Sequence, residues 1–223
     1  MGQPHKLRMS EKLTREIKLA QWFPPNDPLA TQIARLCVLR EYYMLEMRGL
    51  TSDDLRELDA HSDAWRRLYF LFNSVRTLWE IQGAITVICG NAEFKTIRAS
   101  RGAKEQAELK EIVSKLNAAI PELRTVRDSL GGHISQQPLQ SALNAMDSSR
   151  IGDLEIGQTV ADTHYKFARQ LVLEVMLAGI PEAQRADEYK KYIGVLSGLL
   201  PVIQSLETLV IWYAQHRGLV PRS

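Results

Sequence analysis

The sequence predicts an all-α fold, a helical bundle of about six to eight helices. Three observations support this prediction. Apolar residues recur at intervals of three and four along most of the chain, which is the periodicity of an amphipathic helix. Glycine and proline interrupt these runs at short connections. No two neighbouring runs alternate with a period of two, as the strands of a sheet would.

Composition excludes several classes of protein. The 223 residues allow one large domain or one domain with appendages, and a content of 45% hydrophobic and 24% charged residues is typical of a soluble globular chain. Lys and Arg number 28 against 26 Asp and Glu, so no global basic field indicates nucleic-acid binding, and any RNA or DNA contact must be local. We expect Cys37 and Cys89, which lie in apolar runs, to be structural thiols.

The chain divides into three parts by composition. Residues 1–28 form a basic and proline-rich N-terminal segment without the apolar region of a secretory signal, which predicts a cytoplasmic location. Residues 29–217 are expected to form a single helical domain. Residues 219–223 read L-V-P-R-S and look like the remnant of a protease-cleavable tag.

The N-terminal half is expected to contain three helices. A short one is expected over residues 10–22, ahead of the irregular proline-rich stretch. A second follows over residues 29–48, with Gly49 as its end. Its apolar stripe comprises Ile33, Leu36, Cys37, Leu39, Tyr43, Met44 and Met47.

The strongest helical pattern covers residues 63–89, after an acidic helix or linker with a solvated face. Ser62 is expected to cap this helix, and Gly90 with Asn91 to end it in a left-handed conformation. A helix of this length should be central. Its apolar surface comprises Trp65, Leu68, Tyr69, Phe72, Val75, Trp79, Ile81, Ile85 and Ile88.

Residues 92–104 carry four basic side chains and are interpreted as a solvated loop and helix start, in preference to a phosphate-binding patch. An amphipathic helix over residues 105–119 follows, and Pro121 kinks or restarts it. The restarted segment, residues 120–134, closes on Gly131 and Gly132.

Three further helices are expected in the C-terminal part, over residues 139–146, 158–178 and 182–215, with Gly179 to Pro181 ending the second. The last one is apolar enough to be considered as a membrane span. Polar residues on its opposite side and the propensity-lowering Gly194, Gly198 and Pro201 favour a buried or dimer-forming helix instead, so no membrane partner is predicted.

Several common catalytic motifs are missing from the sequence. It contains no glycine-rich phosphate loop, no paired histidines at helical metal spacing and no serine elbow. The sequence therefore predicts neither a metal site nor a cofactor.

One pair of side chains suits metal-independent chemistry. Arg127 is a permanent cation with a planar five-donor fork, and His133 titrates near neutral pH, so together they could bind a phosphate and move a proton beside it. A surface salt bridge with a histidine at a helix end explains the same residues without catalysis, and both interpretations stay open.

The sequence from Arg127 and Asp128 to His133 resembles the R-x(4-6)-H motif of HEPN domains, which are all-helical modules of prokaryotic toxin and antiviral systems. The resemblance implies that Arg127, Asp128 and His133 are catalytic and that the chain is a homodimeric, metal-independent endoribonuclease. It also implies RNA as substrate and a cognate antitoxin or another protein as partner. Gly131 and Gly132 depart from the usual pattern, because they loosen the backbone just before the histidine.

Two other histidines need an interpretation. Arg56 and His61 repeat the motif spacing, but the acidic residues around them would repel a phosphodiester. His164 lies on the apolar side of a predicted helix and is interpreted as a core or interface histidine.

A second function class competes with the nuclease. The chain could be a non-catalytic helical module that dimerises or binds a partner through the apolar side of the final helix. The final helix and the helix over residues 63–89 both present wide apolar faces, and a two-fold dimer would bury them, so we expect a homodimer.

Overall fold

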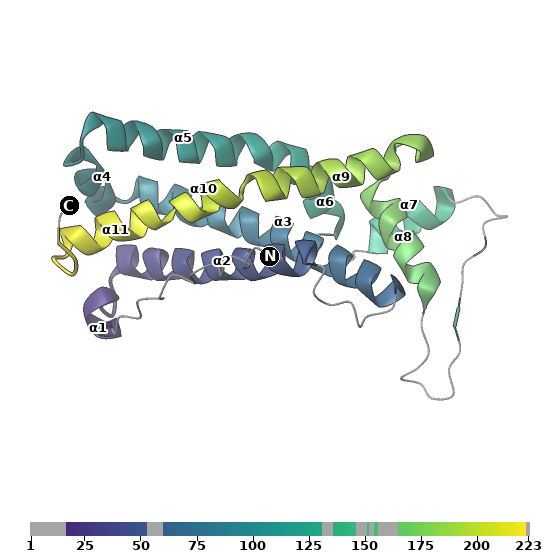
Figure 1. Cartoon of the computed structure of the whole chain (residues 1–223), viewed down its shortest axis with the longest axis horizontal. Helices are drawn as coiled ribbons and strands as arrows, with labels where there is room; N and C mark the ends of the chain where they lie inside the picture. Colours follow the sequence, from purple (N-terminus) through teal and green to yellow (C-terminus); the bar gives the residue numbers. More distant parts are fainter. Residues whose placement is uncertain are drawn as a thin grey trace, which may run out of the picture.

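The computed structural model describes residues 17–52, 60–130, 136–145, 151, 154–155 and 165–221. The fold is all-α, as predicted (Figure 1). The helices are α1 Leu19–Trp22, α2 Pro28–Thr51, α3 Ala60–Gly90, α4 Ala92–Ala99, α5 Ala103–Ala119, the 3-10 turn η1 Ile120–Leu123, α6 Arg124–Leu130, α7 Gln136–Ala145, α8 Lys166–Met176, α9 Glu182–Gly198, α10 Leu200–Ser205 and α11 Glu207–His216.

The last three helices form one long rod, because only Leu199 and Leu206 separate them. Pro201 lies in the first turn of α10, where its missing amide hydrogen costs least. If the single turn of α1 is set aside and η1 is joined to α6, the described residues make eight helical units, within the predicted range.

Four long elements form the body of the bundle and run alternately in opposite directions: α2, α3, α5 and the α9–α11 rod (Figure 1). The short helices α6, α7 and α8 gather at one end of it. Helices α2 and α3 are antiparallel neighbours, and both bury one face completely. The buried residues of the pair include Ile33, Leu36, Tyr43, Met47, Leu71, Val75, Leu78 and Ile85.

The final rod packs its apolar side inside the subunit. Leu196, Ile203 and Tyr213 are fully buried, and the Tyr43 hydroxyl of α2 donates a hydrogen bond of 2.8 Å to the Leu196 carbonyl. The stripe that the sequence offered for dimerisation is therefore covered by the chain itself. The segment Glu182–His216 is also long and apolar enough to cross a membrane, judged by length and composition alone.

Gly49 does not end α2, which is a correction to the sequence prediction. The helix continues through Gly49 to Thr51. A Cβ atom at Gly49 would lie 2.5 Å from ring atoms of Phe70 on α3, so the missing side chain admits the ring. The guanidinium of Arg66, also on α3, donates to the carbonyls of Gly49 and Ser52 and thereby satisfies the end of α2.

The predicted left-handed cap at Gly90 and Asn91 is also wrong. Asn91 has a φ of −64°, and its side chain accepts hydrogen bonds from the amides of Glu93 and Phe94. It is the N-cap of α4, in a stretch that was predicted to be a loop. The helix forms because Phe94 and Ile97 are both buried in the core.

Three smaller predictions differ from the structure at helix boundaries and surfaces. Helix α3 begins at Ala60, so Ser62 lies inside its first turn and not at its cap. Tyr69, expected in the apolar face, is 63% exposed. Helix α8 begins only at Lys166. Residues 1–16 and 156–164, which hold parts of two predicted helices, lie outside the described residues.

The close approach of α3 at Gly49 predicts that alanine replacements at two glycines change the stability of the fold in opposite directions. Gly49→Ala should destabilise the fold by about 1–3 kcal/mol, because the new methyl group displaces the Phe70 ring. Gly83→Ala, in the exposed middle of α3 with no atom within 4 Å of the added Cβ, should instead stabilise by about 0.5–1 kcal/mol. Urea unfolding of both variants measures the difference. Equal effects of the two substitutions would contradict the packing described here.

Candidate functional site

Helix α6 holds the predicted arginine in place. Pro121 lies in the first turn of η1, as expected for a helix restart, and α6 follows without a break. Leu123 and Val126 are fully buried and anchor this segment to the bundle. Arg127 is the next residue in the chain, and its side chain is 35% exposed, at the edge between core and solvent.

Two neighbours fix the guanidinium of Arg127. Its central carbon lies 4.3 Å from the centroid of the Trp79 ring on α3, within cation–π distance. Its Nε donates a hydrogen bond of 2.6 Å to Oδ1 of Asp128. Asp128 also lies 3.9 Å from the Nε of Arg124, one turn earlier. The predicted pair Arg127 and Asp128 is thus in direct contact.

The charges around Arg127 are locally balanced. Glu122, the other acidic residue of this segment, pairs with Lys191 of α9 at 3.5 Å. Arg124 is largely exposed, with 73% of its side chain accessible. Both nearby carboxylates therefore contact cations, so a phosphate that approaches Arg124 and Arg127 would not meet an unpaired negative charge.

The third predicted residue is outside the described part of the chain. Helix α6 ends at Leu130, and Gly131, Gly132 and His133 follow it. The contact between His133 and Arg127 therefore stays a prediction. Arg56, His164 and the side chain of His61 also lie outside the described residues.

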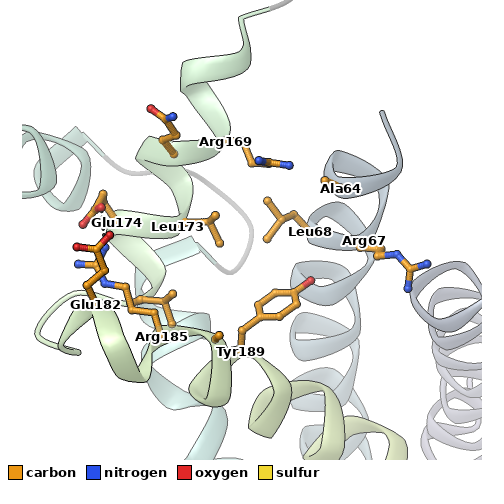
Figure 2. Close-up of a pocket in the computed structure, with 12 residues that line it drawn as sticks. Ala64, Arg67, Leu68, Arg169, Leu173, Glu174, Glu182, Arg185 and Tyr189 are labelled. Carbon is orange, nitrogen blue, oxygen red and sulfur yellow. Dashed lines mark hydrogen bonds and ion pairs between the residues drawn. The ribbon is translucent and has the colours of Figure 1, made fainter. Parts of the chain in front are cut away.

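A second feature is a cleft of about 510 Å³ at the end of the bundle near α6–α8, between the start of α3, helix α8 and the start of α9 (Figure 2). Leu68 and Leu173 face each other across it, and the Tyr189 ring lies below them. Burial raises the pKa of the Tyr189 hydroxyl. The apolar lining residues are Ala64, Leu68, Leu173, Leu177 and Ala186.

Three arginines line the cleft, and two have carboxylate partners. Arg185 donates to Glu174 at 2.6 Å and to the Ile180 carbonyl, and its hydrogen bond to the Glu174 carboxylate raises the pKa of Arg185. Arg67 donates to Asp63 at 2.8 Å and extends away from the cleft (Figure 2). Arg169 has no ion pair with any described residue.

Sequence reasoning missed this cleft because three separate segments build it. One signal was present: Arg169, Leu173 and Leu177 are spaced by four residues, which places a cation in line with an apolar stripe. The cleft is distinct from the Arg127 contact, since Leu68 and Trp79 are eleven residues apart on α3, which is roughly 16 Å of helix.

Comparison of the chain with protein families, curated proteins and solved structures found no match. The resemblance to HEPN domains consequently depends on the sequence motif from Arg127 to His133.

The contact between Arg127 and Trp79 predicts a measurable coupling. In a double-mutant cycle of Arg127→Ala and Trp79→Ala, the two side chains should couple by about 0.5–1 kcal/mol in unfolding free energy. Arg124→Ala is the matched control, because Arg124 lies on the same helix and is mostly exposed. A coupling of Arg124 with Trp79 as large as that of Arg127 would contradict a specific stacking contact.

Proposed function

We propose that this chain is a HEPN-like, metal-independent endoribonuclease of a bacterial toxin or phage-defence type. The observation that supports the proposal is the placement of Arg127. Its guanidinium is held by Trp79 and Asp128 at the surface of the bundle, three residues before the end of α6. His133 follows three residues after that end in the sequence, a stretch that an extended chain spans in about 11 Å.

The proposed chemistry needs one anion-binding group and one proton-transfer group. Arg127 would bind the scissile phosphate of RNA and stabilise the negative charge that develops on it. His133 would take the proton from the ribose 2′-OH, or give a proton to the leaving 5′-oxygen. The 2′-oxygen forms the new bond to phosphorus and the bond to the 5′-oxygen breaks, which leaves a 2′,3′-cyclic phosphate and a 5′-hydroxyl.

Asp128 has a positioning role in this proposal. It accepts a hydrogen bond from Arg127 Nε and so limits the rotation of the guanidinium plane. The remaining donors of the fork can then meet a phosphate in one orientation. In a homodimer two such sites would face one another, so that each copy supplies one arginine and one histidine. A cognate antitoxin or another protein is the expected partner that restrains the activity.

The direct test is cleavage of purified total RNA in the presence of a metal chelator. Wild-type protein should yield fragments that end in 2′,3′-cyclic phosphate. His133→Ala and Arg127→Ala should each lower the rate by about 10²- to 10⁴-fold, since each removes a group that acts in the transition state. His216→Ala is the matched control, because His216 contacts Glu93 at the opposite end of the bundle and should leave the rate unchanged.

Two results would contradict the nuclease. The first is the absence of cyclic-phosphate ends with folded wild-type protein. The second is a rate for His133→Ala equal to that of wild type, because contaminating nuclease would then explain the cleavage.

A second candidate function is a non-catalytic module that dimerises or binds a partner, and an exposed stripe on α2 favours it. Val38, Tyr42 and Leu45 follow helical spacing and are 49%, 55% and 61% exposed. They share one face of α2, whereas the apolar side of the final rod is buried inside the subunit. A docking surface would therefore lie on α2 and not on the final rod.

This candidate predicts a loss of association without a loss of fold. Sedimentation equilibrium of the wild type at micromolar concentration should give twice the chain mass of 25.3 kDa. Leu45→Lys should shift the protein to monomer and keep its helicity, whereas Ala103→Lys, at an exposed position of α5, should leave the dimer intact. Ile203→Lys should unfold the subunit, because Ile203 is completely buried. A wild-type monomer would contradict dimerisation through α2 and the composite nuclease site.

A further inference from the structure

We propose that the cleft between α3, α8 and α9 binds a small amphipathic anion, a molecule with an apolar body and a single anionic head group. The volume of about 510 Å³ falls within the range of natural small-molecule sites. The proposal concerns a different site from the Arg127 contact and does not depend on RNA cleavage.

The apolar body has a defined place. Leu68 from α3 and Leu173 from α8 form opposite walls, and Tyr189 of α9 lies below them (Figure 2). Leu68 belongs to the hydrophobic core, and Leu173 and Tyr189 pack against that core. Filling the space between them would remove apolar surface from water, which provides most of the binding free energy in sites of this kind.

The anionic head has one matching group. Arg169 extends across the upper part of the cleft toward Ala64, above Leu68 and Leu173 (Figure 2). It lies one turn from Leu173 on the same helix, so a ligand between the two leucines would bring its polar end to the guanidinium. The planar fork of arginine suits a carboxylate or a phosphate in a bidentate contact.

The other charges in the cleft favour an anion over a cation. Glu174, whose side chain is only 12% exposed, contacts Arg185, and Glu182 lies beside the same guanidinium. A cationic ligand would have to compete with Arg185 for these carboxylates. An anion at Arg169 displaces no described ion pair, because Arg67 and Arg185 keep their partners Asp63 and Glu174.

The test is isothermal titration calorimetry of the full chain with decanoate and with its neutral twin decanol. Decanoate should bind with a dissociation constant on the order of 10–100 µM, and decanol about tenfold more weakly. Arg169→Gln should reduce decanoate binding to the level of decanol. Lys190→Gln is the matched control, because Lys190 is an exposed cation on α9 outside the cleft and its loss should change neither affinity.

A second variant tests the location. Ala186→Trp places a large ring into the cleft from an exposed position of α9 and should abolish the binding of both probes without loss of helicity. Titration with decyl phosphate identifies the head group. Tighter binding of decyl phosphate than of decanoate would indicate a phosphate ligand, and tighter binding of decanoate would indicate a carboxylate. The proposal would be overturned by no detectable binding of decanoate, by equal affinities in wild type and Arg169→Gln, or by binding that survives Ala186→Trp. RNA cleavage by Arg169→Gln should equal that of wild type, so failure here is separate from failure of the nuclease.

Discussion

The close contact between α2 and α3 at Gly49 is the constraint on which the rest of this bundle depends. The Phe70 ring occupies the space that a side chain at Gly49 would need, and Arg66 closes the end of α2 with hydrogen bonds to its last carbonyls. These contacts set the register of the pair. The buried faces of the two helices fit together in only one register. This register therefore determines where Tyr43 and Leu71 lie in the core.

The two candidate sites depend on this pair in different ways. Helix α3 is 31 residues long and serves both, with Trp79 beneath Arg127 and Leu68 in the wall of the cleft. The Arg127 contact uses the half-buried Trp79 in the middle of α3. The cleft uses its first turns, which line it together with α8 and α9. The support of Arg127 and one wall of the apolar cleft thus come from one continuous helix.

The helical periodicity predicted the fold class and most of the core, because the buried residues of each helix in a bundle recur every three or four positions in the sequence. The same pattern wrongly predicted a helix end at Gly49 and a left-handed cap at Asn91. A glycine can end a helix or make room for a neighbouring ring, and which of the two occurs depends on the helix packed against it. For the site, the sequence predicted the adjacent Arg127 and Asp128 on a proline-started segment. It did not predict Trp79 as the support of Arg127, or the cleft around Arg169, because those contacts join segments that are far apart in the chain.

Native-state hydrogen exchange at increasing urea concentration tests the role of the α2–α3 pair most directly. If the pair is the frame of the fold, amides of its buried residues, such as Tyr43 and Val75, should exchange only through global unfolding, with an opening free energy equal to that of urea denaturation. Amides of α7 and α8 should exchange earlier, through local opening. Exchange of the α2 and α3 amides at lower urea concentration than those of the final rod would contradict the account.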